Sequence, residues 1–209
     1  MDIHIFGGKM VIEDNIDTAY INYKEFITKN GDLITDERGD KLYQIPYYNI
    51  QFHNQFIESG NVQSITIPRN TEFNYDGLRY YCNQLLNPYK GDFIYTYGNR
   101  LRSYFNIDQL ETMIKHLKSN KSSRRAIAST IDPLKDNIES NIPCLQHIQI
   151  AIYDNKLIMY VLFRSNDIKY AFVPNMFGLF ELHLHLARKV GINAGDFYYT
   201  CYNPHWKLK

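Results

Sequence analysis

The stretch QHIQIAIYDNKLIMYVLFRSND, residues 146–167, carries a strong β-strand pattern. Residues 146–152 alternate isoleucine with polar or small side chains, and residues 156–163 form an apolar run of β-prone residues. Each of these patterns indicates a strand. Asp154 and Asn155 lie between the two runs and suit the tight turn of an antiparallel hairpin. We therefore predict a β-hairpin that is followed directly by polar residues.

Helical patterns lie on both sides of this hairpin. Residues 74–86 could form a short helix. Residues 106–119 repeat apolar side chains at helical spacing, after a capping pair formed by Asn106 and Gln109. Residues 176–190 are apolar enough, and long enough, for a buried helix.

Further strands are expected over residues 42–53, 126–130 and 196–200, and a polar turn is expected at residues 36–40. This mixture of strands with a few long helices is typical of an α+β fold. The length of 209 residues suits one domain, which we expect to cover residues 1–209.

The composition excludes several classes of protein. A net charge of +1 gives no basic field for long nucleic acids. Three widely spaced cysteines argue against a disulfide framework, and their spacing does not fit a zinc site. His183 and His185 fall on different helix faces, so no metal is expected. Neither a signal peptide nor a membrane span is evident, so we expect a cytoplasmic protein.

Cys144 is a candidate nucleophile because Pro143 precedes it and restricts the backbone there. Lowering the pKa of a cysteine from about 8.5 towards 7 takes about 2 kcal/mol of thiolate stabilisation, which one nearby arginine could supply. The alternative reading is a small buried hydrophobic residue, which is the commoner fate of a lone cysteine.

Two basic motifs could bind phosphate. Arg164 and Ser165 follow the apolar strand directly. They combine a guanidinium group, which can donate two parallel hydrogen bonds, with a hydroxyl group. An ordinary charged turn is the alternative. Arg124 and Arg125 follow Ser123 and lead into a short strand, which argues against full exposure of both side chains. Adjacent arginines can also form a solvated surface.

Taken in order, these motifs resemble the thymidylate synthase family, which also contains pyrimidine nucleotide hydroxymethylases. The match runs from about residue 36 to residue 205, and the short N-terminal half is most similar to the short archaeal-type members. The matching strings are DERG (36–39), YTYGNRLR (95–102), IDQ (107–109), SRR (123–125), PCL (143–145), FRSND (163–167), PN (174–175), GDF (195–197) and His205.

The resemblance implies a thymidylate synthase-like fold, with a mixed sheet packed against helices and one sheet face at a homodimer interface. It also implies covalent catalysis, in which the Cys144 thiolate attacks carbon 6 of a pyrimidine nucleotide and carbon 5 becomes nucleophilic. The one-carbon carrier would be 5,10-methylenetetrahydrofolate or a related pterin. Hydride transfer would give a methyl group, and capture of water would give a hydroxymethyl group.

The resemblance assigns five positions to the phosphate of the nucleotide. Arg164 and Ser165 match phosphate ligands, and Arg164 would also help to ionise Cys144. Arg38 matches an arginine of an early phosphate-binding loop. Arg124 and Arg125 match arginines that reach the ligand of the neighbouring subunit.

Four further positions match residues that contact the rest of the nucleotide or assist the reaction. Asn175 would hold the pyrimidine edge, and its amide suits uracil better than cytosine. His205 would bind the 3′-hydroxyl of the sugar. Tyr97 and Asp167 match residues that support proton transfer and order water.

The chain departs from the family pattern at three points. The sequence ends four residues after His205, where members usually continue into a closing tail, and this keeps hydroxymethylation of dUMP, dCMP or CMP open as an alternative. Lys207 stands where a sugar-binding tyrosine is usual. The glutamate that assists proton transfer has no clear match among Glu58, Glu72 and Asp76. A nucleotide-binding homologue without turnover is a further alternative.

Overall fold

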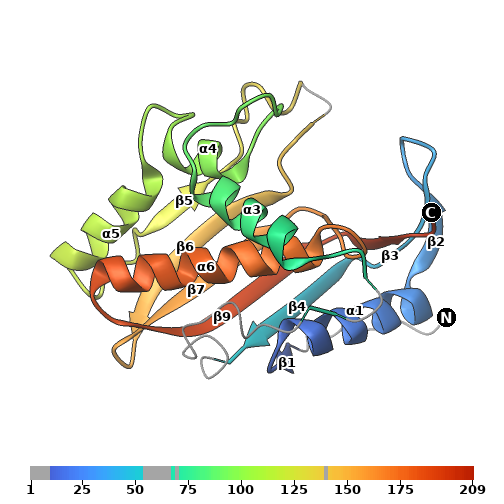
Figure 1. The fold of residues 1–209 in the computed structure, drawn as a ribbon, viewed down its shortest axis with the longest axis horizontal. Coiled ribbons are helices and arrows are strands. Elements are labelled where there is room, and N and C mark those ends of the chain that lie inside the picture. Colours follow the sequence, from blue (N-terminus) through green and yellow to red (C-terminus); the bar gives the residue numbers. More distant parts are fainter. Residues whose placement is uncertain (1–9, 54–66, 69–70, 139–140) are drawn as a thin grey trace.

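The protein has an α+β fold in which two mixed sheets pack with helices (Figure 1). The computed structural model describes residues 10–53, 67–68, 71–138 and 141–209. Within these residues, six strands form the larger sheet, in the order β1 (Val11–Glu13), β4 (Tyr47–Phe52), β9 (Asn193–Tyr202), β7 (Lys156–Phe163), β6 (Leu145–Tyr153) and β5 (Ile127–Ser129). Four form the smaller sheet, in the order β2 (Asp32–Thr35), β3 (Lys41–Gln44), β10 (Pro204–Lys207) and β8 (Asn166–Asp167). The predicted α+β class is confirmed.

The predicted hairpin lies inside the larger sheet. Strands β6 and β7 pair antiparallel with Tyr153 opposite Lys156, and Asp154 and Asn155 both adopt positive φ angles in the turn. Successive residues of β7 alternate between fully buried and half-buried, as expected for a sheet with one covered face. Strand β9 then pairs with β7 in parallel, so the sheet is mixed.

The long helix α6 (Phe172–Val190) crosses the larger sheet and packs against β7 and β9 (Figure 1). It begins four residues before the predicted Met176, because Pro174 is compatible with the first turn of a helix. The other helices within the described residues are α1 (Ile16–Asn30), α3 (Tyr75–Leu86), α4 (Tyr97–Arg102) and α5 (Gln109–Ser119). Of these, α1, α3 and α5 pack against α6. No helix within the described residues is long and apolar enough to cross a membrane.

Aromatic side chains join α6 to the sheet. Phe180 lies edge-on to Phe197 of β9, with ring centroids 4.9 Å apart, and edge-on to Phe52 of β4 at 5.1 Å. All three rings are almost fully buried. Such pairs add about 0.5–1.5 kcal/mol to the burial of their area. The centre of the fold is therefore fixed by rings contributed by two strands and one helix.

The strand predicted over residues 42–53 is wrong as a single element. It divides into β3 and β4, which belong to different sheets. The break falls at Ile45 and Pro46, because proline has no N–H group to continue a ladder. The Ile45 N–H instead donates to the Pro204 carbonyl oxygen at 3.2 Å, and the Pro46 carbonyl oxygen accepts from the Asn203 N–H, also at 3.2 Å.

The predicted helix over residues 106–119 begins later, at Gln109. Asp108 caps it by accepting from the Glu111 N–H at 3.1 Å, whereas Asn106 has a φ of 58° and lies outside the helix. The predicted capping pair is therefore wrong. The Gln109 amide instead bonds to both backbone polar groups of Ser129, at 2.8 and 2.9 Å, and so connects α5 to β5.

Sequence patterns missed helix α1 and the short strands of the smaller sheet. Helix α1 carries many polar residues and buries only one narrow stripe, which includes Tyr20, Tyr23 and Ile27. Strands β2, β8 and β10 have at most four residues each, which is too short for a recognisable alternation. Strands β8 and β10 matter because they line one side of the pocket described next.

Candidate active site

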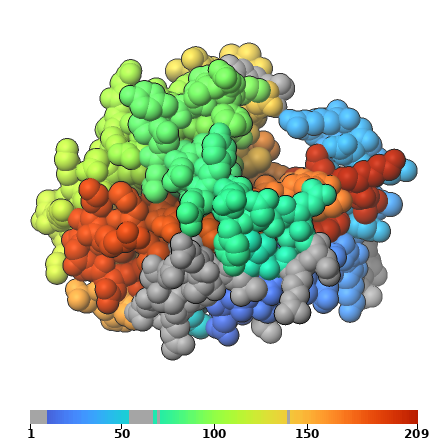
Figure 2. All heavy atoms as spheres, viewed as in Figure 1, coloured from blue at the N-terminus to red at the C-terminus, as the bar shows by residue number. Residues whose placement is uncertain are grey.

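A pocket of about 740 Å³ lies between the smaller sheet and the ends of α3 and α6. In the space-filling view, a hollow opens between the turn that joins β2 to β3 and the segment between α3 and α4 (Figure 2). Eight of the ten predicted site residues line the pocket, although they come from distant parts of the chain. They are Arg38, Tyr97, Cys144, Arg164, Ser165, Asp167, Asn175 and His205.

Cys144 lies at the start of β6, beside the end of β7. The Arg164 N–H donates to the Cys144 carbonyl oxygen at 2.9 Å. The Arg164 side chain donates from Nε to the Pro143 carbonyl oxygen at 3.2 Å and from Nη2 to the Ile142 carbonyl oxygen at 2.8 Å. Arg164 therefore fixes the backbone on both sides of the cysteine, a role that the sequence did not suggest.

The pKa of the Cys144 thiol lies above its ordinary value. Burial is the largest cause, because it disfavours the charged thiolate. Arg164 and Arg38 lower the pKa, and the carboxylate of Asp167 raises it. The predicted lowering of the pKa by Arg164 is present but is outweighed by burial.

Tyr97 begins helix α4 and contacts the backbone beside the cysteine. Its hydroxyl oxygen accepts from the Leu145 N–H at 3.2 Å. Gly98, the next residue, lets α4 approach the C-terminal end of α3 very closely. A Cβ atom at position 98 would lie 2.3 Å from the Gln84 carbonyl oxygen and 2.4 Å from the Asn87 carbonyl oxygen. Only glycine fits there without a shift of the backbone.

The smaller sheet holds Asp167 and His205 in adjacent parallel strands, where they are paired in register. Ser165 Oγ donates to the Asn203 carbonyl oxygen at 3.2 Å and lies 3.2 Å from His205 Nδ1. Asp167 Oδ1 accepts from the Lys169 N–H at 3.0 Å, which leaves the carboxylate at a defined place in the pocket wall. Three side chains predicted separately therefore form one group.

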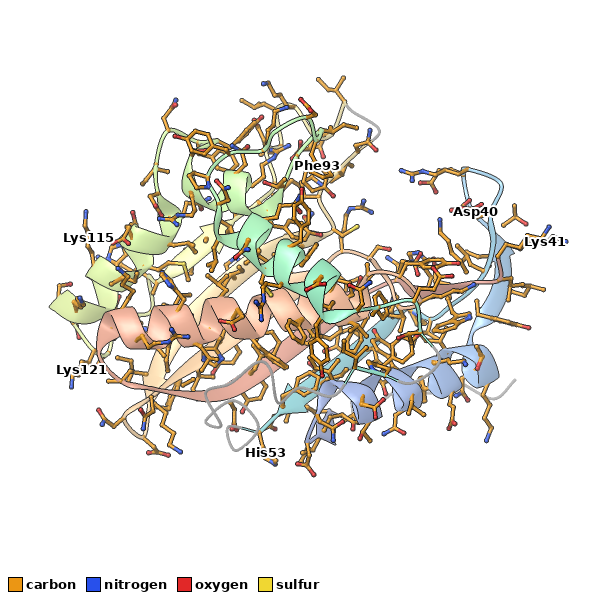
Figure 3. The ribbon with its side chains drawn as sticks, in the orientation of Figure 1. Asp40, Lys41, His53, Phe93, Lys115 and Lys121 are labelled. Carbon is orange, nitrogen blue, oxygen red and sulfur yellow. The ribbon has the colours of Figure 1, made fainter. Side chains whose placement is uncertain are left out.

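Arg38 lies on the turn between β2 and β3, where Asp40 is labelled in Figure 3. The turn is closed by Asp36, whose Oδ1 accepts from the N–H groups of Arg38 and Asp40 at 2.9 and 2.8 Å. Lys207 of β10 donates to Asp40 Oδ2 at 2.7 Å. Lys207 therefore anchors the turn that carries Arg38, and the predicted polar turn is confirmed.

Asn175 lies in the first turn of α6 and is nearly fully buried, yet it lines the pocket. Its Oδ1 atom accepts a hydrogen bond from the hydroxyl group of Tyr81, and its Nδ2 atom donates to Asn166 Oδ1 at 3.1 Å. Sequence reasoning gave no role to Tyr81 or Asn166. Asn166 was part of a matching string, whereas Tyr81 is one of eighteen tyrosines and had no distinguishing signal.

Arg124 and Arg125 do not line this pocket. Both side chains are exposed, which contradicts the expectation that the strand after them would limit their exposure. That strand, β5, begins only at Ile127, so the two arginines precede the sheet.

Two of the three candidates for the proton-transfer acid lie outside the pocket, and the third is not described. Glu72 and Asp76 are exposed and do not line it, and Glu58 lies outside the described residues. Among the described residues, the carboxylates that do line it are Asp36, Glu37 and Asp167.

The other cysteines and the paired histidines lie in the protein interior or on the helix flank. Cys82 and Cys201 are buried, and burial raises the pKa of both thiols, that of Cys82 to about 12. His183 is fully buried with Nε2 2.7 Å from the Leu157 carbonyl oxygen, whereas His185 is half-buried on another face of α6. Across the described ranges, no three His, Cys, Asp or Glu side chains gather in a way that could hold a metal ion.

A mixed sheet places one cysteine in a pocket lined by arginine, hydroxyl and amide groups, an arrangement that could hold a nucleophile beside an anion. The family described as "Thymidylate synthase" matches residues 49–206. A relative from Methanothermobacter marburgensis is 33% identical over 190 residues, which cover 87% of this chain and 85% of the relative. A relative from Methanosarcina mazei is 34% identical over 190 residues, with 90% and 84% covered. Both carry the name "Putative thymidylate synthase". The chain belongs to the thymidylate synthase family, and the fold is the one that this family implies.

Proposed function

We propose that the protein methylates carbon 5 of dUMP to give dTMP, with Cys144 as the nucleophile. One observation carries the proposal: a half-buried thiol shares a pocket with side chains suited to bind a phosphate and with an amide suited to bind a base. Arg38, Arg164 and Ser165 would bind the phosphate, and His205 would bind the sugar. Each charge-assisted bond to the phosphate contributes about 1.5–3 kcal/mol, so these contacts dominate the affinity.

Covalent addition is the first chemical step of the proposal. The Cys144 thiolate forms a bond to carbon 6, the C5–C6 π bond breaks, and its electron pair moves onto carbon 5 and the carbonyl oxygen at carbon 4. The Asn175 Nδ2 group would donate to that oxygen and so stabilise the charge. Tyr97 and Asp167 would support the proton transfers and order water around the base.

The carrier, methylenetetrahydrofolate or a related pterin, would supply the one-carbon unit and, for a methyl product, the hydride. The pocket volume is near the upper part of the usual range for small-molecule sites, about 300–1,000 Å³, which leaves room for a second ligand beside the nucleotide. Tyr81 and Tyr95 line the pocket and offer flat faces against which a ring could stack.

Hydroxymethylation is the second candidate. The pocket is open to solvent between the β2–β3 turn and the segment before α4 (Figure 2), and the side chains of Arg38 and Arg164 are exposed. Water that reaches the intermediate would yield a hydroxymethyl product from the same Cys144 adduct.

A homodimer accompanies the proposed activity. The face of the larger sheet that α6 does not cover carries the half-buried residues Ile158, Tyr160, Leu162 and Tyr198, with the two tyrosine rings stacked 5.0 Å apart. Burial of this face against a second copy would remove it from water. Arg124 and Arg125 would then serve the partner's pocket. Sedimentation equilibrium of the wild type and of Leu162→Asp tests this, because the variant should be monomeric if the face forms the interface.

The activity is tested by a product assay. The protein is incubated with methylenetetrahydrofolate and dUMP or dCMP, and the nucleotide product is identified by mass spectrometry. We expect a product 14 mass units above dUMP, because one CH2 unit is gained, and none with Cys144→Ser. A hydroxymethyl product would favour the second candidate.

If neither nucleotide gives a product, a second assay shows whether Cys144 is still reactive. Exchange of the hydrogen at carbon 5 of dUMP with solvent, measured without folate, reports on the thiol alone. If the hydrogen exchanges but no product forms, the protein uses a one-carbon carrier other than methylenetetrahydrofolate. If dUMP binds without exchange, catalysis is refuted and a nucleotide-binding homologue is favoured.

A further inference from the structure

A continuous chain of hydrogen bonds runs from the pocket into the core. Tyr81 donates to Asn175 Oδ1, Asn175 Nδ2 donates to Asn166 Oδ1 at 3.1 Å, and Asn166 Nδ2 donates to the hydroxyl oxygen of Tyr199 at 3.0 Å. All three bonds donate in the same direction, from α3 towards β9. Hydrogen bonds arranged in one direction polarise and strengthen each other.

This direction fixes the orientation of the Asn175 amide. If the Asn175 amide turned by 180°, its oxygen would face the oxygen of Asn166, and two acceptors would meet. Relief would require Asn166 to turn as well, the Tyr199 hydroxyl to change from acceptor to donor, and the Tyr81 hydroxyl to change from donor to acceptor. Asn175 and Asn166 are only 4% and 1% exposed, so water cannot easily compensate for an unpaired group. One orientation of the coupled pair is therefore favoured.

The fixed amide presents a defined pattern to the pocket. Asn175 Oδ1 has a second lone pair and Nδ2 has a second hydrogen, because the chain uses only one of each. An acceptor beside a donor matches a ring edge with an N–H group next to a carbonyl oxygen, as in uracil. Cytosine presents a bare ring nitrogen next to an amino group, which matches only the reversed amide.

We propose that Asn166 and Tyr81 are specificity-determining positioning residues, which hold the Asn175 amide in the orientation that binds a uracil edge and rejects a cytosine edge. Both act through Asn175. The inference rests on the proposed function, because it takes the pocket to be a pyrimidine nucleotide site. The inference goes beyond the proposed function because it assigns the choice between uracil and cytosine to Asn166 and Tyr81, which lie behind Asn175.

The test measures the dissociation constants of dUMP and dCMP by calorimetry, without folate, for the wild type and three variants. The wild type should bind dUMP at least about 10-fold more tightly than dCMP. Asn166→Leu removes the acceptor that opposes reversal, so the ratio should fall to about 2 or less. Tyr81→Phe removes one of the bonds that set the direction and should lower the ratio about 3-fold.

Tyr170→Phe is the matched control. Tyr170 lines the same pocket but is not part of the chain of hydrogen bonds, so its loss of a hydroxyl group should leave the ratio at the wild-type value. A merely structural role of Asn166 or Tyr81 would weaken the binding of both nucleotides together and would not change the ratio. If Asn166→Leu does not fold, as judged by its melting transition, Tyr81→Phe decides the question because it keeps the ring.

Two results would overturn the inference: a wild type that binds dCMP as tightly as dUMP, or a ratio unchanged in Tyr81→Phe and in any folded Asn166→Leu. Failure of the proposed function looks different. A protein that prefers dUMP and responds to these variants, yet forms no product, would refute catalysis and leave the inference standing. Absence of binding to either nucleotide would refute both.

Discussion

The two sheets contribute to the same pocket, but they are packed very differently. In the larger sheet, Phe163 and Tyr199 lie fully buried beneath α6. In the smaller sheet, β2 is mostly exposed, and Leu33 keeps 58% of its surface accessible. The larger sheet carries Cys144, whereas the smaller one and its turn carry Arg38 and His205. The larger sheet thus holds the atom proposed to react, with Arg164 at the end of β7 beside it. The lighter smaller sheet and its turn hold two further groups proposed to bind the nucleotide, Arg38 and His205.

This division suits a site that must combine accuracy with exchange of ligands. A nucleophile needs a fixed position, and well-packed elements provide it. Ligand contacts on a thinly packed sheet cost less to rearrange when nucleotide enters and leaves. The following predictions test whether stability, ionisation and binding divide between the sheets in this way.

The largest expected effect is on the packing of the larger sheet. Phe197→Ala removes a ring that contacts Phe180 and Phe52, and should lower the free energy of unfolding by about 3–5 kcal/mol. Leu33→Ala in the smaller sheet is the control, with an expected loss of about 0.5 kcal/mol or less. Urea denaturation measures both. Equal losses of unfolding free energy in the two variants would show that the two sheets are packed equally well.

The second prediction concerns pH and the contact between α6 and β7. Burial lowers the pKa of His183 to about 4, from 6.5 in the unfolded chain. Between pH 4 and pH 6.5 the unfolded state binds more protons than the folded state. The contribution of neutral His183 to the free energy of unfolding is therefore complete above pH 6.5 and is lost as the pH falls towards 4. The expected loss is about 3 kcal/mol. Urea denaturation at pH 7 and pH 4.5 should show a smaller difference for His183→Gln, whose amide can still donate to the Leu157 carbonyl oxygen.

A third prediction addresses the thiol. Because burial raises the pKa of Cys144, its alkylation by iodoacetamide should quicken steadily from pH 7 to pH 9 as the thiolate fraction grows. Arg164→Gln should slow the reaction about fivefold at pH 7, since Arg164 favours the thiolate. Mass spectrometry of peptides identifies the labelled position. Buried Cys82 and Cys201 serve as internal controls, and labelling there at a comparable rate would contradict the prediction.

The smallest effect is expected on the smaller sheet. Lys207→Met breaks the partly exposed ion pair with Asp40 and should lower the free energy of unfolding by about 1 kcal/mol or less, with less effect at high salt. Because that pair anchors the turn of Arg38, nucleotide affinity should fall a few-fold. Calorimetry with dUMP measures this. Lys41→Met on the neighbouring strand is the control, and an equal loss of affinity there would exclude the anchoring role.

The sequence predicted the larger sheet better than the smaller one, for a physical reason. Strands β6 and β7 are long, have one covered face and are joined by a turn with two suitable residues, so their pattern is local. The strands of the smaller sheet are short, and β3 and β10 pair across most of the chain, as Lys207 with Leu42 shows. No local pattern encodes such a pairing. The break at Pro46 was visible in the sequence, but its consequence, a change of sheet, was not.

The site shows the same limit. The resemblance to a known family identified Cys144, Arg164 and Asn175, and the fold brings them to one pocket. It could not identify Tyr81, because the significance of that tyrosine depends on how α3 packs beside α6. It also could not foresee that burial would outweigh the arginines in setting the pKa of the thiol. Both facts depend on surroundings that only the three-dimensional structure supplies.

Gly98 has a consequence for how such a protein can change over generations. The carbonyl groups that close around its Cα atom belong to the last turn of α3, the helix that also carries Tyr81. A single added methyl group would push that helix away and would move Tyr81 relative to Asn175. A lineage that explores new bases or new carriers can therefore alter the pocket side chains one at a time, but it must inherit the spacing between these two helices unchanged.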